Sequence, residues 1–430
     1  MGKNSNFITN FEFAMKQDIT KTILLPLMLL VCIAGFSQEY RTIKGRVEDS
    51  GTGKPLASAS VSLKNSTLSN VTNSEGEFSL KIPQENANDT LVISYLGYRN
   101  LQKPVAEFAP GKKNRVKLFP TTLDIISITV RTGNAQDLFL SAFSPRYTRQ
   151  NYSTESVGMR GFYRETIRKG NKYLTLAEAI VNIHKQPYTK DADDNISIYK
   201  GRGNTNRNAS DTIFMQLQGG PLSTLYLDVV KDPFIAVDML SATSYYNFSA
   251  GPVMFMDNMN IYTIDFNQDK ETEEILYRGR IYIESQSLAV VRIEFEMNVE
   301  GRRNAWKEFI RKKPSDVNID VERARYQINY KQGKDNKWHF DYARIDLRFK
   351  GKYKGKWMKN NYDIQTELAI TDLENDAALK IPSAERFRMK EILQNEIKAF
   401  EDESFWGNYN VIEPDEKIEN IIRKIRRQLK

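Results

Sequence analysis

The residues that could carry chemistry are few. Among 430 residues, the only histidines are His184 and His339 and the only cysteine is Cys32. Zinc and iron–sulfur sites draw mainly on Cys and His ligands, so this set excludes most metalloenzyme mechanisms and any intramolecular disulfide. His184 lacks the neighbours of a zinc motif, and His339 alternates with Trp338 and Phe340 on what we expect to be the wet face of a strand. We therefore predict that both histidines are ordinary surface or edge residues and that the protein has no metal or cofactor.

Two polar stretches could bind a ligand through oxygens or backbone amides. Asp191–Asn195 offers hard oxygen ligands but lacks the glycine and the distal Glu of a calcium loop, so we expect a solvated acidic loop. Gly201–Asn204 has glycine spacing without the Lys-Ser/Thr of a phosphate-binding loop. No carboxylate pair stands out for glycoside hydrolysis, which also requires distances that a sequence does not give. We predict no catalytic residue, no cofactor-binding residue and no enzyme activity, with a hydrolase that uses carboxylates alone as the third hypothesis.

The composition fits an exported β-rich protein more than a nucleic-acid-binding one. The net charge of +8 comes from 62 basic and 54 acidic residues that are largely interleaved, which is typical of a solvated surface. We therefore expect no nucleic-acid partner. The 21 Tyr and 22 Phe suit antiparallel sheets, where large side chains pair across strands. A chain of this length holds two or three domains.

Residues 1–37 have the pattern of a secretory signal peptide. Lys16 and Lys21 precede an apolar run, Ile23–Phe36, and cleavage is expected between Ser37 and Gln38. Residues 1–14 are a possible mis-started extension. The apolar run is shorter than the roughly 20 residues of a membrane span, although a retained anchor is the alternative. We predict that the protein is exported and is periplasmic or associated with the outer membrane.

Residues 41–119 alternate apolar and polar positions in short segments separated by turns. Turn residues occupy Gly51–Pro55, Asn73–Gly76 and Leu96–Tyr98, and Pro83 stops one segment. Short strands with one apolar face bury it by packing sheet on sheet, so the pattern predicts a β-sandwich. Its expected core positions are Ile43, Val47, Ala59, Val61, Leu63, Phe78, Leu80, Ile82, Leu91, Ile93 and Tyr95.

These turns and strands resemble a known family. The motifs Gly45–Val47, Gly53–Leu56, Thr72–Phe78 and Ile93–Tyr98 look like those of the carboxypeptidase regulatory-like domain, a transthyretin-like sandwich found at the front of cell-envelope proteins and TonB-dependent outer-membrane receptors. The resemblance implies an accessory domain and not a catalytic one. It departs from the receptors after residue 119, because the remaining roughly 300 residues lack the long regular series of lipid-facing strands that such a receptor needs.

The rest of the chain predicts a larger antiparallel sheet. Residues 120–150 are expected to be a linker with a short helix that Asn134 caps, and residues 151–375 a β-rich domain. Within it, residues 187–211 are polar and are predicted to form an exposed loop. The apolar parity changes between Tyr342 and Ile345, which predicts a bulge near Ala343–Arg344. The expected strands are 159–166, 173–181, 279–284, 289–297, 326–330, 338–349 and 362–370.

Residues 376–430 predict a helical end. Ser383 is expected to cap one helix that reaches Phe400, and Pro414-Asp415 opens another with an isoleucine stripe and the cations Arg423, Lys424, Arg426 and Arg427. Such a basic helix can make a peripheral membrane contact, or its stripe can dock on the body while the cations complement the helix dipole. We expect docking.

The predicted fold class is therefore mainly β, with an N-terminal transthyretin-like β-sandwich followed by a larger antiparallel β-sheet domain with C-terminal helices. The favoured function is a non-catalytic cell-envelope binding or assembly protein whose partner is an envelope protein, a glycan or a lipid. The alternative is a lipid or lipoprotein carrier-like protein with a curved, aromatic-lined sheet. A large apolar cavity favours the carrier, and a filled core favours a binding or structural role.

Overall fold

The structure is a computed structural model that describes ten segments of the chain. The predicted signal peptide, residues 1–37, and residues 122–133 of the predicted linker lie outside the described residues. No helix among the described residues is long and apolar enough to cross a membrane. The described segments are 40–121, 134–205, 219–233, 244–269, 274–302, 304–309, 315–355, 359–374, 380–397 and 405–429.

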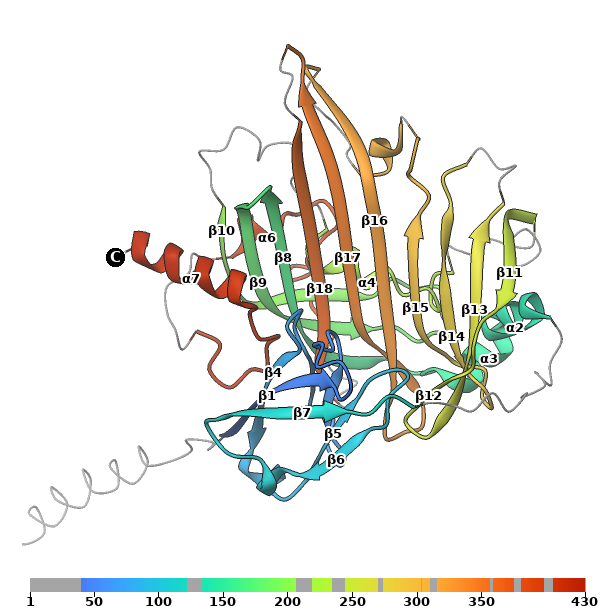
Figure 1. The fold of residues 1–430 in the computed structure, drawn as a ribbon, viewed down its shortest axis with the longest axis vertical. Coiled ribbons are helices and arrows are strands. Elements are labelled where there is room, and N and C mark those ends of the chain that lie inside the picture. The colour runs from blue at the N-terminus through green and yellow to red at the C-terminus, as the bar shows by residue number, and fades with distance from the viewer. Residues whose placement is uncertain are drawn as a thin grey trace, which may run out of the picture.

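The N-terminal module, residues 40–121, is a β-sandwich as predicted (Figure 1). Its first sheet has the order β4-β1-β7 and its second the order β3-β2-β5-β6, with short 3-10 turns at Gln84–Asn86 and Val105–Glu107. Ten of the eleven predicted core positions are buried in a single cluster between the two sheets, and Tyr95 packs against that cluster partly buried. The strands are β1 (Tyr40–Asp49), β2 (Ser60–Leu63), β3 (Ser69–Val71), β4 (Glu77–Pro83), β5 (Thr90–Ser94), β6 (Leu101–Pro104) and β7 (Lys113–Leu118).

The centre of this core explains one glycine. Phe78 is 1% exposed, and its ring lies over Gly45 on the paired strand β1. A Cβ at Gly45 would lie 2.5 Å from Cε1 of Phe78, so no larger residue fits without moving the ring. Close packing of the aromatic ring therefore requires glycine at position 45.

The body is one antiparallel sheet of 11 strands. Its order is β10-β9-β8-β18-β17-β16-β15-β14-β13-β11, with β12 paired to β13, so that the last strand, β18, lies beside the first, β8. The strands are β8 (Val157–Lys169), β9 (Lys172–Lys185), β10 (Asn195–Thr205), β11 (Tyr246–Ala250), β12 (Met254–Met256), β13 (Met259–Gln268), β14 (Tyr277–Glu284), β15 (Val290–Met297), β16 (Val317–Gln332), β17 (Trp338–Tyr353) and β18 (Asn360–Glu374).

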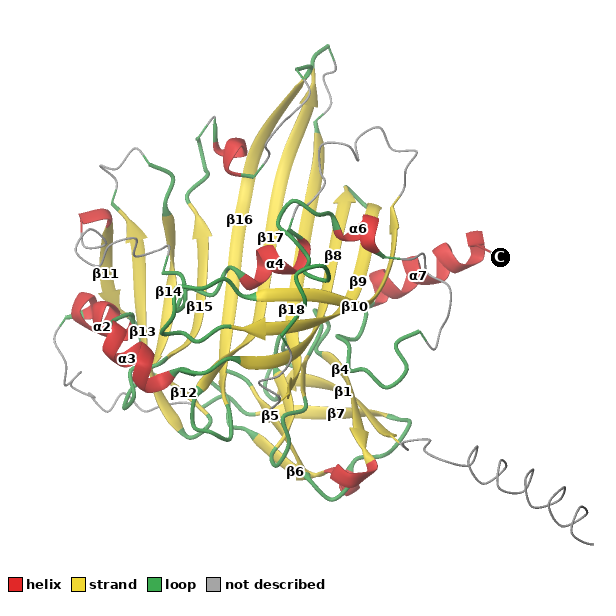
Figure 2. Cartoon of the chain, turned by 180° about the vertical axis from the view of Figure 1, so that it is seen from behind, coloured by secondary structure: helices red, strands yellow, loops and turns green. Residues whose placement is uncertain are grey.

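Helices cover one side of this sheet, which we call the inner face (Figure 2). They are α2 (Ala135–Ala142), α3 (Pro145–Asn151), α4 (Gly220–Leu225) and α6 (Leu393–Glu396), with a 3-10 turn at Ala305–Glu308. Asn134 caps α2 as predicted, its Oδ1 accepting from the Asp137 amide at 2.9 Å. Phe139, Leu225 and Leu393 are fully buried against the sheet. These helices therefore pack apolar side chains against the described part of the inner face.

The module and the end of the C-terminal segment, residues 405–429, lie on the opposite side, the outer face (Figure 1). Val71 of the module, Phe162 and Tyr342 of the sheet and Trp406 of the C-terminal segment share one buried cluster. Asn70 Nδ2 of the module donates to the backbone carbonyls of Ser79 and Val411, at 2.9 and 2.8 Å. The module, the sheet and the C-terminal segment therefore pack together.

The C-terminal segment is less helical than the sequence suggests. The predicted helix from Ser383 toward Phe400 is wrong over the described residues, because only α6 is helical there. Phe387 instead donates its backbone N–H to the Ile196 carbonyl at 2.8 Å, which holds the chain against the edge strand. The final helix, α7 (Glu416–Leu429), begins as predicted, with Asp415 Oδ1 accepting from the Ile418 amide at 2.9 Å.

The predicted loop at residues 187–211 is also wrong, because β10 occupies Asn195–Thr205. Gly201 and Gly203 favoured a loop in the sequence, but they lie in this strand. A Cβ at Gly201 or Gly203 would overlap the side chain of Ile397, so the strand uses glycine to let Ile397 pack on it.

The predicted bulge in β17 exists, but it lies two residues earlier. Tyr330 pairs with Phe340 and Asn329 with Tyr342, so Asp341 is the extra residue. A bulge changes the direction in which side chains point, and here it turns an aspartate toward the module.

Candidate functional site

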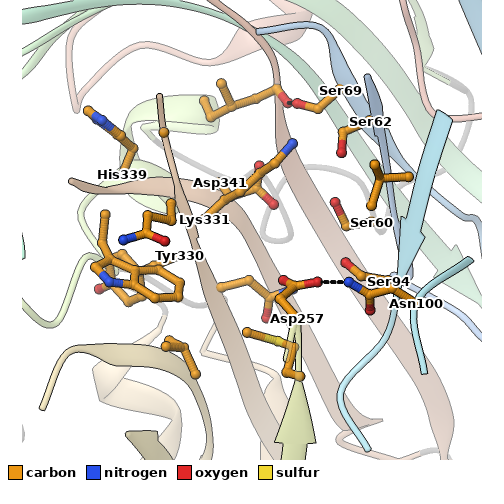
Figure 3. Close-up of a pocket in the computed structure, with 18 of the residues that line it drawn as sticks. Ser60, Ser62, Ser69, Ser94, Asn100, Asp257, Tyr330, Lys331, His339 and Asp341 are labelled. Atoms are coloured by element: carbon orange, nitrogen blue, oxygen red, sulfur yellow. Dashed lines mark hydrogen bonds between the residues drawn. The ribbon is translucent and has the colours of Figure 1, made fainter. Parts of the chain in front are cut away.

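A cavity of about 630 Å³ lies where the module meets the sheet (Figure 3). One wall is the β3-β2-β5-β6 sheet of the module, and the other is the turn end of the β16–β17 hairpin together with β12. Both units contribute residues, so neither alone forms the site. Its volume falls within the roughly 300–1,000 Å³ of small-molecule sites.

Serines are prominent in the wall from the module. Ser60 pairs with Ser94 across β2 and β5, and Ser62 pairs with Ser69 across β2 and β3. These positions alternate with the core residues Val61 and Leu63, so the serines lie on the opposite face of the sheet. Ser69 donates to the Ile370 carbonyl at 2.9 Å. The hydroxyls of Ser60, Ser62 and Ser94 have no hydrogen-bond partner among the described residues and face the cavity.

The opposite wall carries a separated pair of charges. Lys331 on β16 and the bulged Asp341 on β17 both point toward the serines (Figure 3). Asp341 is 8% exposed, yet neither side chain has a hydrogen-bond or ion-pair partner among the described residues. Burial raises the pKa of Asp341 and lowers the pKa of Lys331, and the charge of each partly offsets the shift of the other. A buried carboxylate and an ammonium that do not pair with each other lower the stability of the folded state. A ligand that forms hydrogen bonds with both would offset that cost.

At the rim of the cavity, polar groups of the module and of the sheet form hydrogen bonds with each other. Asn100 of the module donates to Asp257 in the turn after β12, and Gly97 N–H donates to the Phe255 carbonyl at 2.8 Å. Tyr95 lines the cavity on the module side. These contacts join the module to the β12 hairpin and so hold the two walls of the cavity together.

The histidines are not surface residues, so that prediction is wrong. His184 is 5% exposed on β9, which lies inside the sheet, and His339 is 4% exposed. His339 borders the cavity, where its Nε2 lies 3.1 Å from Oδ2 of Asp335. His339 does lie on the opposite side of the strand from Trp338 and Phe340, as alternation predicts, but the turn that carries Gly333 and Asp335 covers it.

The acidic loop is only partly solvated. Asp191 and Asp193 are exposed, but Asp194 is 5% exposed and forms ion pairs with Lys185 and Lys231, both at 2.5 Å. Lys185 also reaches Asp228 at 2.7 Å, and Tyr188 and Tyr330 donate to that carboxylate. This fully paired network fastens the loop after β9 to the inner face. The described residues contain no group of His, Cys, Asp and Glu placed to hold a metal ion.

Comparison with known proteins identifies the module. Residues 43–130 match the family model described as CarboxypepD_reg-like domain. The module belongs to that family. A chain segment of 86 residues is 37% identical to the TonB-dependent receptor SusC of Bacteroides thetaiotaomicron; the match covers 18% of this chain and 8% of the receptor. The chain therefore matches only a small part of that receptor's length.

Solved structures give a weaker likeness. A LolA superfamily protein from Nitrosomonas europaea and a DUF1329 family protein from Desulfovibrio piger each superpose with a TM-score of 0.24, at 9% and 10% identity, covering 59% of this chain and 97% of theirs. MucB superposes with a TM-score of 0.18, at 8% identity, over 55% of this chain and 92% of its own. Scores this low do not establish a shared fold for the body.

Proposed function

We propose that the protein is a non-catalytic binding protein of the cell envelope whose ligand occupies the cavity between the CarboxypepD_reg-like domain and the sheet. The observation that carries this proposal is Asp341, a buried carboxylate without a partner among the described residues, aimed into a cavity that two structural units build together. The predicted signal peptide and the domain shared with an outer-membrane receptor support a periplasmic or outer-membrane location. The cavity hydroxyls face a lysine and an aspartate that can orient a ligand by hydrogen bonds.

The competing function is a carrier that holds a lipid on the curved sheet. Such a carrier requires open apolar space, whereas the described inner face is occupied by α2, α4 and α6. The geometry therefore favours binding in the polar cavity on the outer face.

Native mass spectrometry of protein purified from its own host tests the proposal. We expect wild-type protein to carry a bound mass that Ser60→Phe, which fills the cavity, removes. Ser249→Phe, at an exposed position of β11, is the control and should retain it. A mass equal to the chain alone would overturn the proposal, and a bound lipid that survives Ser60→Phe would support the carrier.

A further inference from the structure

The charge arrangement of the cavity restricts the chemistry of its ligand, provided that the cavity is a binding site as proposed. Lys331 supplies only donors, and ionised Asp341 supplies only acceptors. The two are not paired with each other or with any other side chain in the described part of the protein. A ligand must therefore satisfy a donor and an acceptor that face the same space.

An ionic ligand satisfies only part of this site. An anion would pair with Lys331 but would face Asp341 and Asp257. The other cations of the lining, Lys64, Arg292 and Lys334, already donate to Gln102, Glu294 and the Asn65 carbonyl. A cation would pair with the aspartates but would face Lys331. A hydroxyl both accepts and donates, so one or two neighbouring hydroxyls can accept from the ammonium and donate to the carboxylate.

The serines of the module wall also favour a ligand that both donates and accepts hydrogen bonds. Ser60, Ser62 and Ser94 present hydroxyls that each donate and accept and carry no charge. Such a surface matches a ligand with many hydroxyls along its length. Because serine is small, the wall also leaves space between the two β-sheets, and Tyr95 adds an aromatic edge on the same side.

From this geometry we infer that the ligand is a neutral polyhydroxylated molecule, a saccharide, held with its hydroxyls between Lys331 and Asp341 on one wall and the three serines on the other. The saccharide lies between the CarboxypepD_reg-like domain and the β16–β17 hairpin, so binding also stabilises the docked arrangement of the two units.

Isothermal titration with three variants of the full mature chain separates the ligand classes. The neutral probes are maltotriose, cellotriose and mannotriose, the acidic probe is trigalacturonic acid, and the basic probe is a glucosamine trimer. We expect at least one neutral probe to bind wild type, and both Lys331→Met and Asp341→Asn to weaken that binding at least about tenfold. The control variant Asp320→Asn/Lys350→Met changes an acid and a lysine that face each other across the same hairpin, far from the cavity, and should bind as wild type does.

Charged ligands give the opposite pattern, because each variant then removes either the attraction or the repulsion. If the acidic trimer binds, and binds more tightly to Asp341→Asn, the ligand is an anion and the inference is wrong. If the glucosamine trimer binds, and binds more tightly to Lys331→Met, the ligand is a cation and the inference is equally wrong. A bound mass in native protein together with no binding of any neutral probe overturns the saccharide assignment and leaves the proposed binding function standing. Thermal unfolding of each variant checks that the fold is retained.

Discussion

Glu178 and Arg164 form an ion pair in which both side chains are almost fully buried, with Nε of Arg164 donating to Oε1 of Glu178 at 2.8 Å. Arg202 donates to the other carboxylate oxygen at 2.9 Å, and Arg164 also donates to the backbone carbonyl of Ile412 at 2.7 Å. The ring of Trp406 lies 4.8 Å from the Arg202 guanidinium. The ion pair thus fastens the C-terminal segment onto the sheet.

This pair belongs to a row of polar side chains that crosses nine strands of the outer face. Each member lies directly opposite the next in the strand pairing, and charges alternate in sign except at Gln327. The order is Asp265, Arg280, Glu294, Gln327, Arg344, Glu367, Arg164, Glu178 and Arg202. The C-terminal segment covers the part around Glu178, whereas the part from Asp265 to Arg344 lines an open groove.

Removing Glu178 should therefore be costly. Glu178→Ala leaves two buried guanidinium groups without their carboxylate, and we expect the free energy of unfolding to fall by about 3–5 kcal/mol. Glu296→Ala is the matched control, because Glu296 also binds two arginines, Arg278 and Arg325, but its side chain is 23% exposed. That change should cost about 0–1 kcal/mol. Equal losses in urea denaturation would show that burial does not determine how much these ion pairs contribute to stability.

Glu165 gives a prediction about pH. It is fully buried on the inner face, where Tyr163 donates to it at 2.9 Å and Gln394 also donates, and burial raises its pKa from 4.5 to about 7. The folded state then binds a proton more tightly than the unfolded state, so the contribution of Glu165 to stability is present below pH 4.5 and is lost as the pH rises through about 7. Glu165→Gln should remove that loss and be more stable than wild type at pH 8 by about 1–3 kcal/mol.

Urea denaturation of both proteins at pH 5 and pH 8 measures this difference. The two proteins should differ less at pH 5, where Glu165 is protonated in the folded state. An equal difference at both pH values would show that Glu165 does not titrate in this range.

The sequence predicted those parts of the fold in which local pattern and tertiary packing agree. In the module, each segment of alternating apolar and polar residues ends in a turn of Gly, Pro or Asn. The sequence pattern therefore predicts the core around Phe78. The sequence pattern did not predict β10, because its glycines, Gly201 and Gly203, make room for Ile397, which lies almost 200 residues later in the chain. It also failed for residues 383–392, where binding to the edge of the sheet replaces the helix.

The candidate site could not be predicted because it lies between two units. Ser60, Ser62 and Ser94 are ordinary polar positions of a half-buried sheet until the body lies opposite them. The one signal in the sequence was the parity change in β17. It indicated a bulge, and the bulge is the feature that turns Asp341 toward the cavity.

The module core is tested by a pair of neighbouring substitutions. Phe78→Ala removes a ring that is 1% exposed and should cost about 3–5 kcal/mol. Glu77→Ala, on the other face of the same strand, loses only the ion pair with Lys113 and should cost less than about 1 kcal/mol. Small and equal shifts of the denaturation midpoint would contradict the observed strand register.

The export prediction concerns the processed end of the chain. If residues 1–37 are a cleaved signal peptide, the mature protein begins at Gln38. N-terminal sequencing of protein from the envelope fraction checks this. A sequence that begins at Met1 or Met15 would contradict it and would favour a retained N-terminal segment.

The terminal helix α7 distinguishes docking from membrane contact. Ile418 and Ile422 are 4% and 5% exposed and pack on Leu176 of β9, as docking predicts. Replacing Ile422 with Asp places a carboxylate in this contact and should lower the unfolding free energy by about 2–4 kcal/mol. Arg423 is exposed, so Arg423→Gln should change stability by less than about 0.5 kcal/mol.

The membrane hypothesis makes a separate claim about the four cations of this helix. If Arg423, Lys424, Arg426 and Arg427 bind an anionic surface, each contributes about 1 kcal/mol, and the association weakens steeply with salt. If the helix docks through its isoleucines, changing all four to Gln leaves both the melting temperature and the cellular fraction unchanged, because the isoleucines and not the cations then hold the helix. We expect the second result. A quadruple variant that leaves the membrane fraction while keeping its melting temperature would show that the cations bind the membrane even though Ile418 and Ile422 hold the helix on the sheet.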